Sequence, residues 1–224
     1  MTISIKDLAK ILPVIEKLNK SGTDLYISDE LGKLKNTDEK ALKVLLAAII
    51  SLRTREKTTW EVSLRLFGRL DNLKDLNKIS LAELRKLLYP CGFYRRKATQ
   101  MKQLAAILNE RYSGRVPDDL DELLTLPGVG RKVANLVLIE AFDKDGICVD
   151  THVHRIFNRW KLVKTKTPEQ TEMELRKILP KIYWKTINKI LVKFGQNTCL
   201  PIKPKCSTCF LLKKCPYGNG LVLS

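Results

Sequence analysis

The sequence predicts an almost entirely α-helical protein. Apolar residues recur at helical spacing in segments 41–50 and 81–88, and further helical stretches are expected near 58–67 and 97–112. Nowhere do several alternating, β-branched runs line up with hairpin turns, as a sheet would require. Because 44% of the 224 residues are hydrophobic, the chain can bury a substantial core in one or two domains.

Helix start motifs support this fold class. Ser80 and Glu83 have the spacing of a capping box in front of the segment that begins at residue 81. Thr167 is a candidate N-cap with Pro168 at the first helical position, which predicts a helix that runs to about residue 179. Two helices therefore have expected starting points as well as expected apolar faces.

The charge of the chain indicates the kind of partner it binds. The sequence has 41 Lys and Arg against 24 Asp and Glu, a net charge of +17 that is spread along its length. Such an excess favours a polyanion, although a lysine-rich solvated surface would give the same composition. The longest apolar run, 41–50, is interrupted by Lys43 and is too short to span a bilayer. We expect a cytoplasmic, nucleoid-associated protein with no targeting segment and no membrane partner.

A glycine turn is the first candidate binding site. Gly128 and Gly130 flank Val129 in LPGVGRKVANLVLIEAF, and an apolar helical pattern begins near Arg131. Glycines let the backbone approach a partner closely, and the N–H groups at the start of the next helix form an anion site that suits a DNA phosphate. A tight turn between two helices would need the same glycines, so this motif alone leaves both interpretations open.

Lys132 is the candidate nucleophile. It lies in the first turn of the helix after the glycines, where the positive end of the helix dipole disfavours a cation and so favours the neutral amine that a Schiff-base former needs. The alternative is a surface lysine that contacts phosphate. Asp150, eighteen residues later in CVDTHVHRIFNRW, is either the N-cap of a helix from Thr151 or a carboxylate facing the same cleft as Lys132.

Four cysteines form the strongest local motif. Cys199, Cys206, Cys209 and Cys215 follow the spacing C-x6-C-x2-C-x5-C, so one loop supplies four thiolates. Zinc usually takes two separated C-x-x-C pairs, and a single loop also suits an iron–sulfur cubane, so spacing leaves both metals open.

The surroundings of this loop are basic. Lys203 and Lys205 lie between the first two cysteines, with Lys213 and Lys214 before the last, and we expect these lysines to face phosphates. Ordinary solvated lysines are the alternative. The isolated Cys91 and Cys148 are interpreted as buried thiols.

Taken together, LPGVGRK, VDTH and the cysteine loop, with GFYRRKA at 92–98, resemble the endonuclease III family from about residue 41 to 217. The resemblance implies a helix-hairpin-helix glycosylase of two helical lobes. Residues 34–144 would form a six-helix barrel with the hairpin, and residues 1–33 and 145–224 would form a lobe that holds a [4Fe–4S] cluster. DNA would bind in a cleft between the lobes.

The resemblance also implies roles for single residues. Lys132 would attack C1′ of a flipped nucleotide with assistance from Asp150, and the four cysteines would ligate the cluster. The substrate would be double-stranded DNA with damaged pyrimidines or abasic sites, cleaved by β-elimination, and the enzyme would act as a monomer. Relatives with Ser or Tyr in place of the lysine only release the base. A mismatch glycosylase without lyase activity and a non-catalytic, metal-stabilised DNA-binding module are the competing hypotheses.

Two further DNA contacts follow from the resemblance. Arg53, in SLRTRE, stands where many bacterial relatives place Gln to fill the vacated base stack, which leaves the damage preference open. Phe93, in GFY, matches the position of an apolar wedge that offsets part of the cost of unstacking. A core aromatic residue is the alternative for Phe93.

Overall fold

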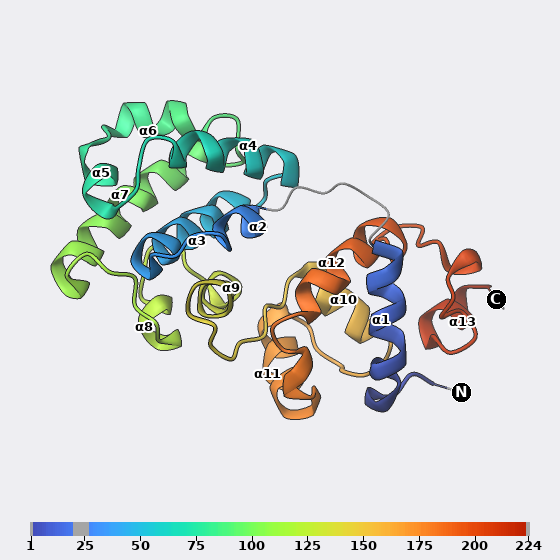
Figure 1. Ribbon diagram of the computed structural model, residues 1–224. Helices are drawn as coiled ribbons and strands as arrows, with labels where there is room; N and C mark the ends of the chain where they lie inside the picture. Colours follow the sequence, from blue (N-terminus) through green and yellow to red (C-terminus); the bar gives the residue numbers. More distant parts are fainter. Residues whose placement is uncertain (1, 20–26, 223–224) are drawn as a thin grey trace. The chain divides into compact units, whose positions relative to one another are not determined.

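The computed structural model describes residues 2–19 and 27–222, and every regular element in those residues is a helix (Figure 1). The predicted all-α fold class is therefore confirmed. The described residues fall into two compact units, one made of residues 2–19 and 147–222 and the other of residues 27–146. In the described part of the chain no helix combines the length and apolarity needed to cross a membrane.

The unit of residues 27–146 is built around one apolar helix. Its helices are α2 (Ile27–Leu31), α3 (Thr37–Ser51), α4 (Glu56–Phe67), α5 (Leu73–Lys78), α6 (Leu81–Leu88), α7 (Tyr94–Tyr112), α8 (Leu120–Leu124) and α9 (Arg131–Phe142). Every residue of α3 from 41 to 50 is buried, because this helix packs against α2, α4, α7 and α9. Leu31 of α2 also lies in this core, so the unit begins before the expected residue 34, and it ends at residue 146 instead of 144.

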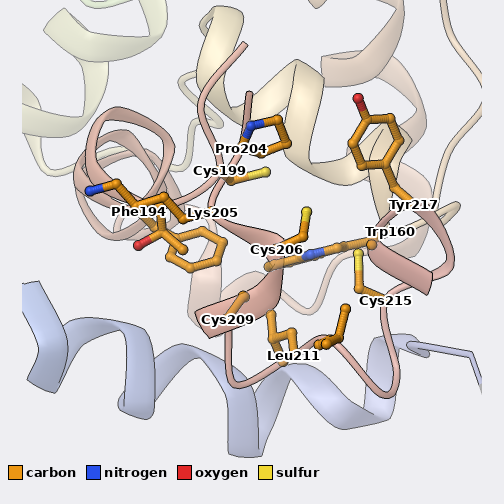
Figure 2. Close-up of a pocket in the computed structure, with 13 residues that line it drawn as sticks. Trp160, Phe194, Cys199, Pro204, Lys205, Cys206, Cys209, Leu211, Cys215 and Tyr217 are labelled. Atoms are coloured by element: carbon orange, nitrogen blue, oxygen red, sulfur yellow. The ribbon is translucent and has the colours of Figure 1, made fainter. Parts of the chain in front are cut away.

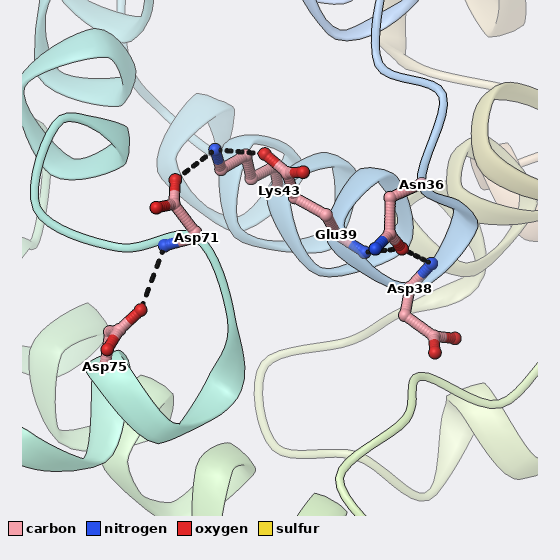
Figure 3. Close-up of polar contacts among 6 residues, drawn as sticks. All are labelled: Asn36, Asp38, Glu39, Lys43, Asp71 and Asp75. Atoms are coloured by element: carbon pink, nitrogen blue, oxygen red, sulfur yellow. Dashed lines mark hydrogen bonds and ion pairs between the residues drawn. The ribbon is translucent and has the colours of Figure 1, made fainter.

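One lysine interrupts the buried segment 41–50 of helix α3. Lys43 is 7% exposed, and its ammonium group contacts Glu39 at 2.6 Å and Asp71 at 3.4 Å (Figure 3). The Lys43 ammonium also lies 5.8 Å from the centre of the Phe67 ring. Because its stem is buried while its head reaches two carboxylates, Lys43 is accommodated in the apolar segment that it interrupts.

Both chain termini contribute to the other unit. Its α-helices are α1 (Leu8–Asn19), α10 (Thr151–Arg159), α11 (Pro168–Ile178), α12 (Ile187–Asn197) and α13 (Pro216–Val222). Helix α1 packs on α12, and the Asn19 side-chain amide donates to the Ile190 carbonyl at 2.8 Å. The core combines α1 residues with Phe157 and Trp160 of the C-terminal part. The N-terminal segment is therefore part of a core that the rest of the unit needs.

The expected helix starts are largely as predicted. Thr167 accepts a hydrogen bond from the Gln170 N–H at 3.3 Å, and α11 begins at Pro168. Ser80 accepts from the Glu83 N–H at 3.1 Å. The Glu83 carboxylate pairs instead with Arg69 at 2.8 Å, so only half of the expected capping box is formed.

A buried lysine holds the loop that follows α3. Lys97 of α7 is 3% exposed, and its ammonium group donates to the carbonyls of Ile50 and Leu52, both at 2.7 Å, and to the Thr54 hydroxyl at 3.0 Å. Burial lowers the pKa of Lys97. Three acceptors match the three donors of an ammonium group, so this side chain fastens the end of α3 to α7.

We predict that Lys97→Met lowers the free energy of unfolding by roughly 2–4 kcal/mol, because it leaves buried acceptors without a donor. Lys102→Met is the matched control. Lys102 also donates to three backbone carbonyls, at distances of 2.9 to 3.1 Å, but it is partly exposed, so water can replace it and we expect a loss of at most about 1 kcal/mol. Urea unfolding of both variants measures the difference, and equal losses would contradict the assigned role of Lys97.

Candidate functional site

Two exposed loop tips meet in the unit of residues 27–146. Arg53 follows α3 and Phe93 precedes α7, and the Arg53 guanidinium carbon lies 5.5 Å from the centre of the Phe93 ring. Both residues have positive φ angles, 52° for Arg53 and 58° for Phe93. Such backbone strain in residues other than glycine is concentrated at functional sites. Phe93 is 60% exposed, so the alternative that it is a core aromatic is wrong.

Gly92 explains why these tips lie so close together. A Cβ atom at Gly92 would lie 2.2 Å from the Arg53 carbonyl oxygen, so only glycine fits at this position. The Gly92 N–H donates to the Thr54 hydroxyl at 3.1 Å, and that hydroxyl also accepts from the buried Lys97. The close backbone contact at Gly92 of the GFY motif therefore holds Phe93 beside Arg53.

The glycine turn between α8 and α9 has the expected form. Gly128 adopts a φ of 80°, and a Cβ atom there would come within 3.2 Å of the Gln100 side chain. Gly130 is exposed, is the N-cap of α9 and has open space where a Cβ would point. Val129 differs from the glycines, because its side chain is buried and its N–H already donates to the Leu126 carbonyl at 3.1 Å. The Val129 side chain therefore anchors the turn in the core, and a DNA contact at this residue stays a prediction.

Lys132 occupies the second position of α9 and is partly exposed. The opposite face of α9 carries Val133, Ala134, Val137 and Leu138, all buried, and this helix packs against α3. Its orientation is therefore fixed by the core and its first turn by the glycines. Lys132 consequently has a defined position directly after a turn that is open to a ligand.

Asp150 caps α10. One carboxylate oxygen, Oδ1, accepts from the N–H groups of His152 at 2.8 Å and Val153 at 3.0 Å, so the N-cap interpretation is confirmed. A capped carboxylate cannot rotate freely, and capping therefore also fixes the direction in which it points. The pairing of Asp150 with Lys132 stays a prediction.

The two histidines have packing partners in the same unit. His154 Nδ1 lies 2.6 Å from the Thr171 hydroxyl, and burial lowers the pKa of His154. His152 Nδ1 lies 3.1 Å from an Arg155 nitrogen, and the same ring abuts Gly195. These contacts match structural roles for both rings.

The four cysteines of the C-terminal loop line one hollow, which Trp160 also borders (Figure 2). Tight backbone turns gather them: the Cys209 N–H donates to the Cys206 carbonyl at 3.1 Å, and the Cys215 N–H donates to the Leu211 carbonyl at 2.7 Å. All four are free, half-buried thiols. The loop therefore places all four cysteines around one hollow.

Two thiols of the hollow have raised pKa values. Burial raises the pKa of Cys206 and of Cys209, and the nearby Cys199 and Cys215 raise both pKa values further. Thiolates so placed repel one another unless a positive centre lies between them. In the part of the chain that the structure describes, no three or more His, Cys, Asp or Glu side chains are arranged to hold a metal ion.

Two arginines of α10 fasten the cysteine loop, and sequence reasoning did not identify them. Arg155 donates to the carbonyls of Cys199 at 3.0 Å and Gly195 at 2.8 Å. Arg159 donates to the Cys199 sulfur at 3.2 Å and to the carbonyls of the next two residues, and its guanidinium carbon lies 4.2 Å from the centre of the Tyr217 ring. Arg155 and Arg159 are four residues apart, so both lie on one face of α10. This spacing is visible in the sequence.

The lysines beside the loop differ in their surroundings. Lys203, Lys205 and Lys213 are exposed. Lys214 forms an ion pair with Asp7 at 3.1 Å, and hydrogen bonds from Ser4 together with Lys214 lower the pKa of Asp7 to about 2. Lys214 is thus also tied to the N-terminal segment, and its contact with phosphate stays a prediction.

Comparison with known proteins places this architecture in a family. Residues 46–181 match the HhH-GPD superfamily of base excision DNA repair proteins. Endonuclease III of Thermotoga maritima is 46% identical over 192 residues, which cover 84% of this chain and 89% of that protein. Endonuclease III homolog 1, chloroplastic, of Arabidopsis thaliana is 43% identical over 84% of this chain, which spans only 52% of that relative.

Solved structures agree with these sequence matches. A non-covalent endonuclease III–DNA complex has a TM-score of 0.83 and 30% identity and covers 100% of both chains. A trapped covalent endonuclease III–DNA intermediate has the same TM-score and identity and covers 98% of this chain and 99% of that one. The chain therefore belongs to the endonuclease III family of HhH-GPD base excision DNA repair proteins.

Proposed function

We propose that this chain, a DNA glycosylase and AP lyase of base excision repair, acts as a monomer on double-stranded DNA that contains damaged pyrimidines or abasic sites, with Lys132 as its nucleophile. The observation that carries the proposal is the position of Lys132 in the first turn of α9, directly after the open Gly130 turn. The covalent endonuclease III–DNA intermediate supports a nucleophile of this kind in the family.

The first step exchanges a bond to the base for a bond to the enzyme. The lone pair of the neutral Lys132 amine forms a bond to C1′, while the bond from C1′ to the base breaks and the base leaves with its electron pair and takes up a proton. The nitrogen then loses a proton, and the bond from C1′ to O4′ breaks while O4′ takes up a proton, which leaves an iminium between Lys132 and C1′. Because C1′ is inaccessible within a stacked duplex, the nucleotide must first be flipped out.

The second step breaks the strand. The positive iminium makes the C2′ protons acidic. Removal of one of them forms a C2′–C3′ double bond and breaks the C3′–O3′ bond, so the phosphate leaves together with O3′ and that electron pair. Water then hydrolyses the imine and restores the lysine. Only an amine supports this elimination, since a hydroxyl at the same position forms no iminium.

Other residues prepare the substrate for this chemistry. We assign Asp150 to the stabilisation of positive charge on the sugar, with its direction set by the α10 cap. Exposed Phe93 serves as the wedge and Arg53 fills the vacated stack, held together by the Gly92 contact. Gly128 and Gly130 shape the turn that receives a phosphate, and Lys203 and Lys205 add phosphate contacts beside the cysteine loop.

The cysteine loop fits a [4Fe–4S] cluster held by Cys199, Cys206, Cys209 and Cys215. Four free thiols border one hollow, and each of Cys206 and Cys209 experiences the charge of its neighbours. Each of the four cysteines would supply one thiolate ligand to such a cluster. When bound, the cluster would supply a cross-link that keeps the loop in shape.

Borohydride trapping tests the nucleophile. We expect borohydride to join the protein covalently to duplex DNA that contains thymine glycol or an abasic site, and we expect Lys132→Gln to abolish the adduct because an amide forms no imine. Lys10→Gln, which alters an exposed lysine of α1, is the control and should be trapped like the wild type. Trapping that persists in Lys132→Gln would remove the assignment, and base release without strand cleavage by the wild type would favour the mismatch glycosylase.

Substitutions of Asp150 separate its role as a helix cap from its proposed role in the reaction. Asn caps a helix about as well as Asp, so Asp150→Asn should leave the melting temperature nearly unchanged while single-turnover cleavage slows by roughly 10²–10⁴-fold. Asp150→Ala should slow cleavage similarly and in addition lose about 1 kcal/mol of stability with the cap. If Asp150→Asn cleaves at the wild-type rate, the carboxylate has only a structural role.

The metal is tested by composition. We expect about four irons per chain and an absorbance band at about 400 nm, both lost in Cys206→Ala, because a cubane needs its fourth thiolate. Cys91→Ala is the control, since this buried cysteine lies in the other unit, and it should retain the iron. A colourless protein with one zinc per chain would show that the loop binds zinc instead.

A further inference from the structure

A shallow groove on the unit of residues 27–146 has no role in the reaction described above. It has a volume of about 730 Å3, within the size range of ligand sites, and is lined by Ala82, Arg85, Lys86, Tyr89, Tyr94 and Arg95. These residues come from α6, from the turn that follows it and from the first turn of α7. Aromatic and cationic side chains therefore meet at one surface.

The groove presents aromatic surface to solvent. Tyr89 is 61% exposed, and its ring stands edge to face with Tyr94, with 5.5 Å between the ring centres and 84° between the ring planes. The Arg95 guanidinium carbon lies 5.6 Å from the centre of the Tyr94 ring, and its Nε donates to the Tyr94 hydroxyl at 3.1 Å. The Tyr94 ring is thus held by its neighbours, while the Tyr89 ring remains accessible.

The backbone beneath Tyr89 is braced from another helix. Arg65 of α4 donates to the Leu87 carbonyl at 2.9 Å and 2.7 Å, and it also donates to the Tyr89 carbonyl. These bonds use carbonyl groups that the end of α6 leaves without helical partners. The platform is therefore prearranged, which reduces the entropy lost when a ligand binds.

The charge of the groove is of one sign. From Leu84 to Asn109 the sequence has six Lys and Arg and no Asp or Glu. Glu83, the acidic residue of α6, is paired with Arg69 at 2.8 Å. Within the described residues, Arg85 and Lys86 are exposed and form no ion pair. A polyanion can therefore approach without displacing a carboxylate.

We propose that this groove binds an unpaired segment of a DNA strand, with a base stacked on Tyr89 and phosphates contacted by Arg85 and Lys86. Cationic tracks interleaved with exposed rings are the general pattern of single-strand binding, because every base has a π face and every link carries a charge. A duplex covers its base faces, so it would not use Tyr89. Tyr94 of the groove directly follows Phe93 in the sequence, and this proposal rests on the proposed function only in taking DNA as the ligand.

Base stacking is tested with a thymidine oligonucleotide that carries one 2-aminopurine, whose fluorescence is quenched on stacking. We expect wild-type protein and Tyr89→Phe to quench it, whereas Tyr89→Leu, which keeps the bulk but lacks the π face, should lose the quenching and bind roughly ten-fold more weakly. Tyr89 is exposed and only its backbone is braced, so the variants should fold, as thermal melting will verify. Equal quenching by Tyr89→Leu and wild type would overturn the proposal.

Phosphate contact is tested by salt dependence. Each phosphate contact on a single strand contributes about 0.7 to the slope of log affinity against log salt, so Arg85→Ala/Lys86→Ala should reduce that slope by roughly 1.4. Lys10→Ala/Lys17→Ala removes the same charge from exposed positions of α1 and should leave the slope unchanged. Equal slopes for both double variants would overturn the proposal, as would displacement of the oligonucleotide by polyglutamate at equal charge concentration, which would indicate an acidic protein partner.

These outcomes are separable from those of the trapping experiment. Wild-type protein that is trapped on damaged duplex but fails to quench the oligonucleotide overturns the groove and leaves the proposed function intact. Protein that quenches the oligonucleotide without being trapped supports the groove and overturns the function.

Discussion

Burial of α3 is the constraint on which the unit of residues 27–146 depends. Ten consecutive residues of this helix are withdrawn from water, and α9 packs against it along its apolar face. Hydrophobic burial of this extent fixes both helices rigidly. The end of α3 leads to Arg53, and the start of α9 carries Lys132. The packing of these two helices in one core therefore determines the positions of two candidate functional residues.

Rigid support is what allows strained residues at the surface. Arg53 and Phe93 both adopt positive φ angles, which most side chains avoid, and both are exposed to solvent. Such strain persists only where the surroundings overdetermine the backbone. Here the surroundings are Gly92, which admits the Arg53 carbonyl, and Lys97, which saturates the carbonyls at the end of α3. The hydrogen bonds of buried Lys97 thus help to hold the exposed Phe93 ring in place, although the backbone conformation of Phe93 is unfavourable by itself.

In the unit of residues 2–19 and 147–222, polar contacts hold the cysteine loop. The loop has few buried side chains, and it is joined to α10 through Arg155 and Arg159, whose guanidinium groups donate to the carbonyls of Cys199 and Leu200. Arg159 also donates to the Cys199 sulfur, so the same side chain that supports the loop touches one of its proposed ligands. Lys214 joins the loop to Asp7 of the N-terminal segment. The loop is therefore held by contacts with α10 and with the N-terminal segment.

The sequence by itself determined what depends on local periodicity and spacing. Helical spacing identified α3 and α6, and cap residues located the start of α11. The cysteine pattern indicated that one loop carries all four cysteines. Each of these features is decided within a few residues of chain. Tertiary structure alone decided the rest: that α1 completes the core of the C-terminal part, that Glu83 pairs with Arg69, that Val129 is buried and that Phe93 is exposed. Each of these outcomes depends on which distant segment of the chain packs against the residue. Competition between partners that are far apart in the chain produces no periodic pattern in the sequence.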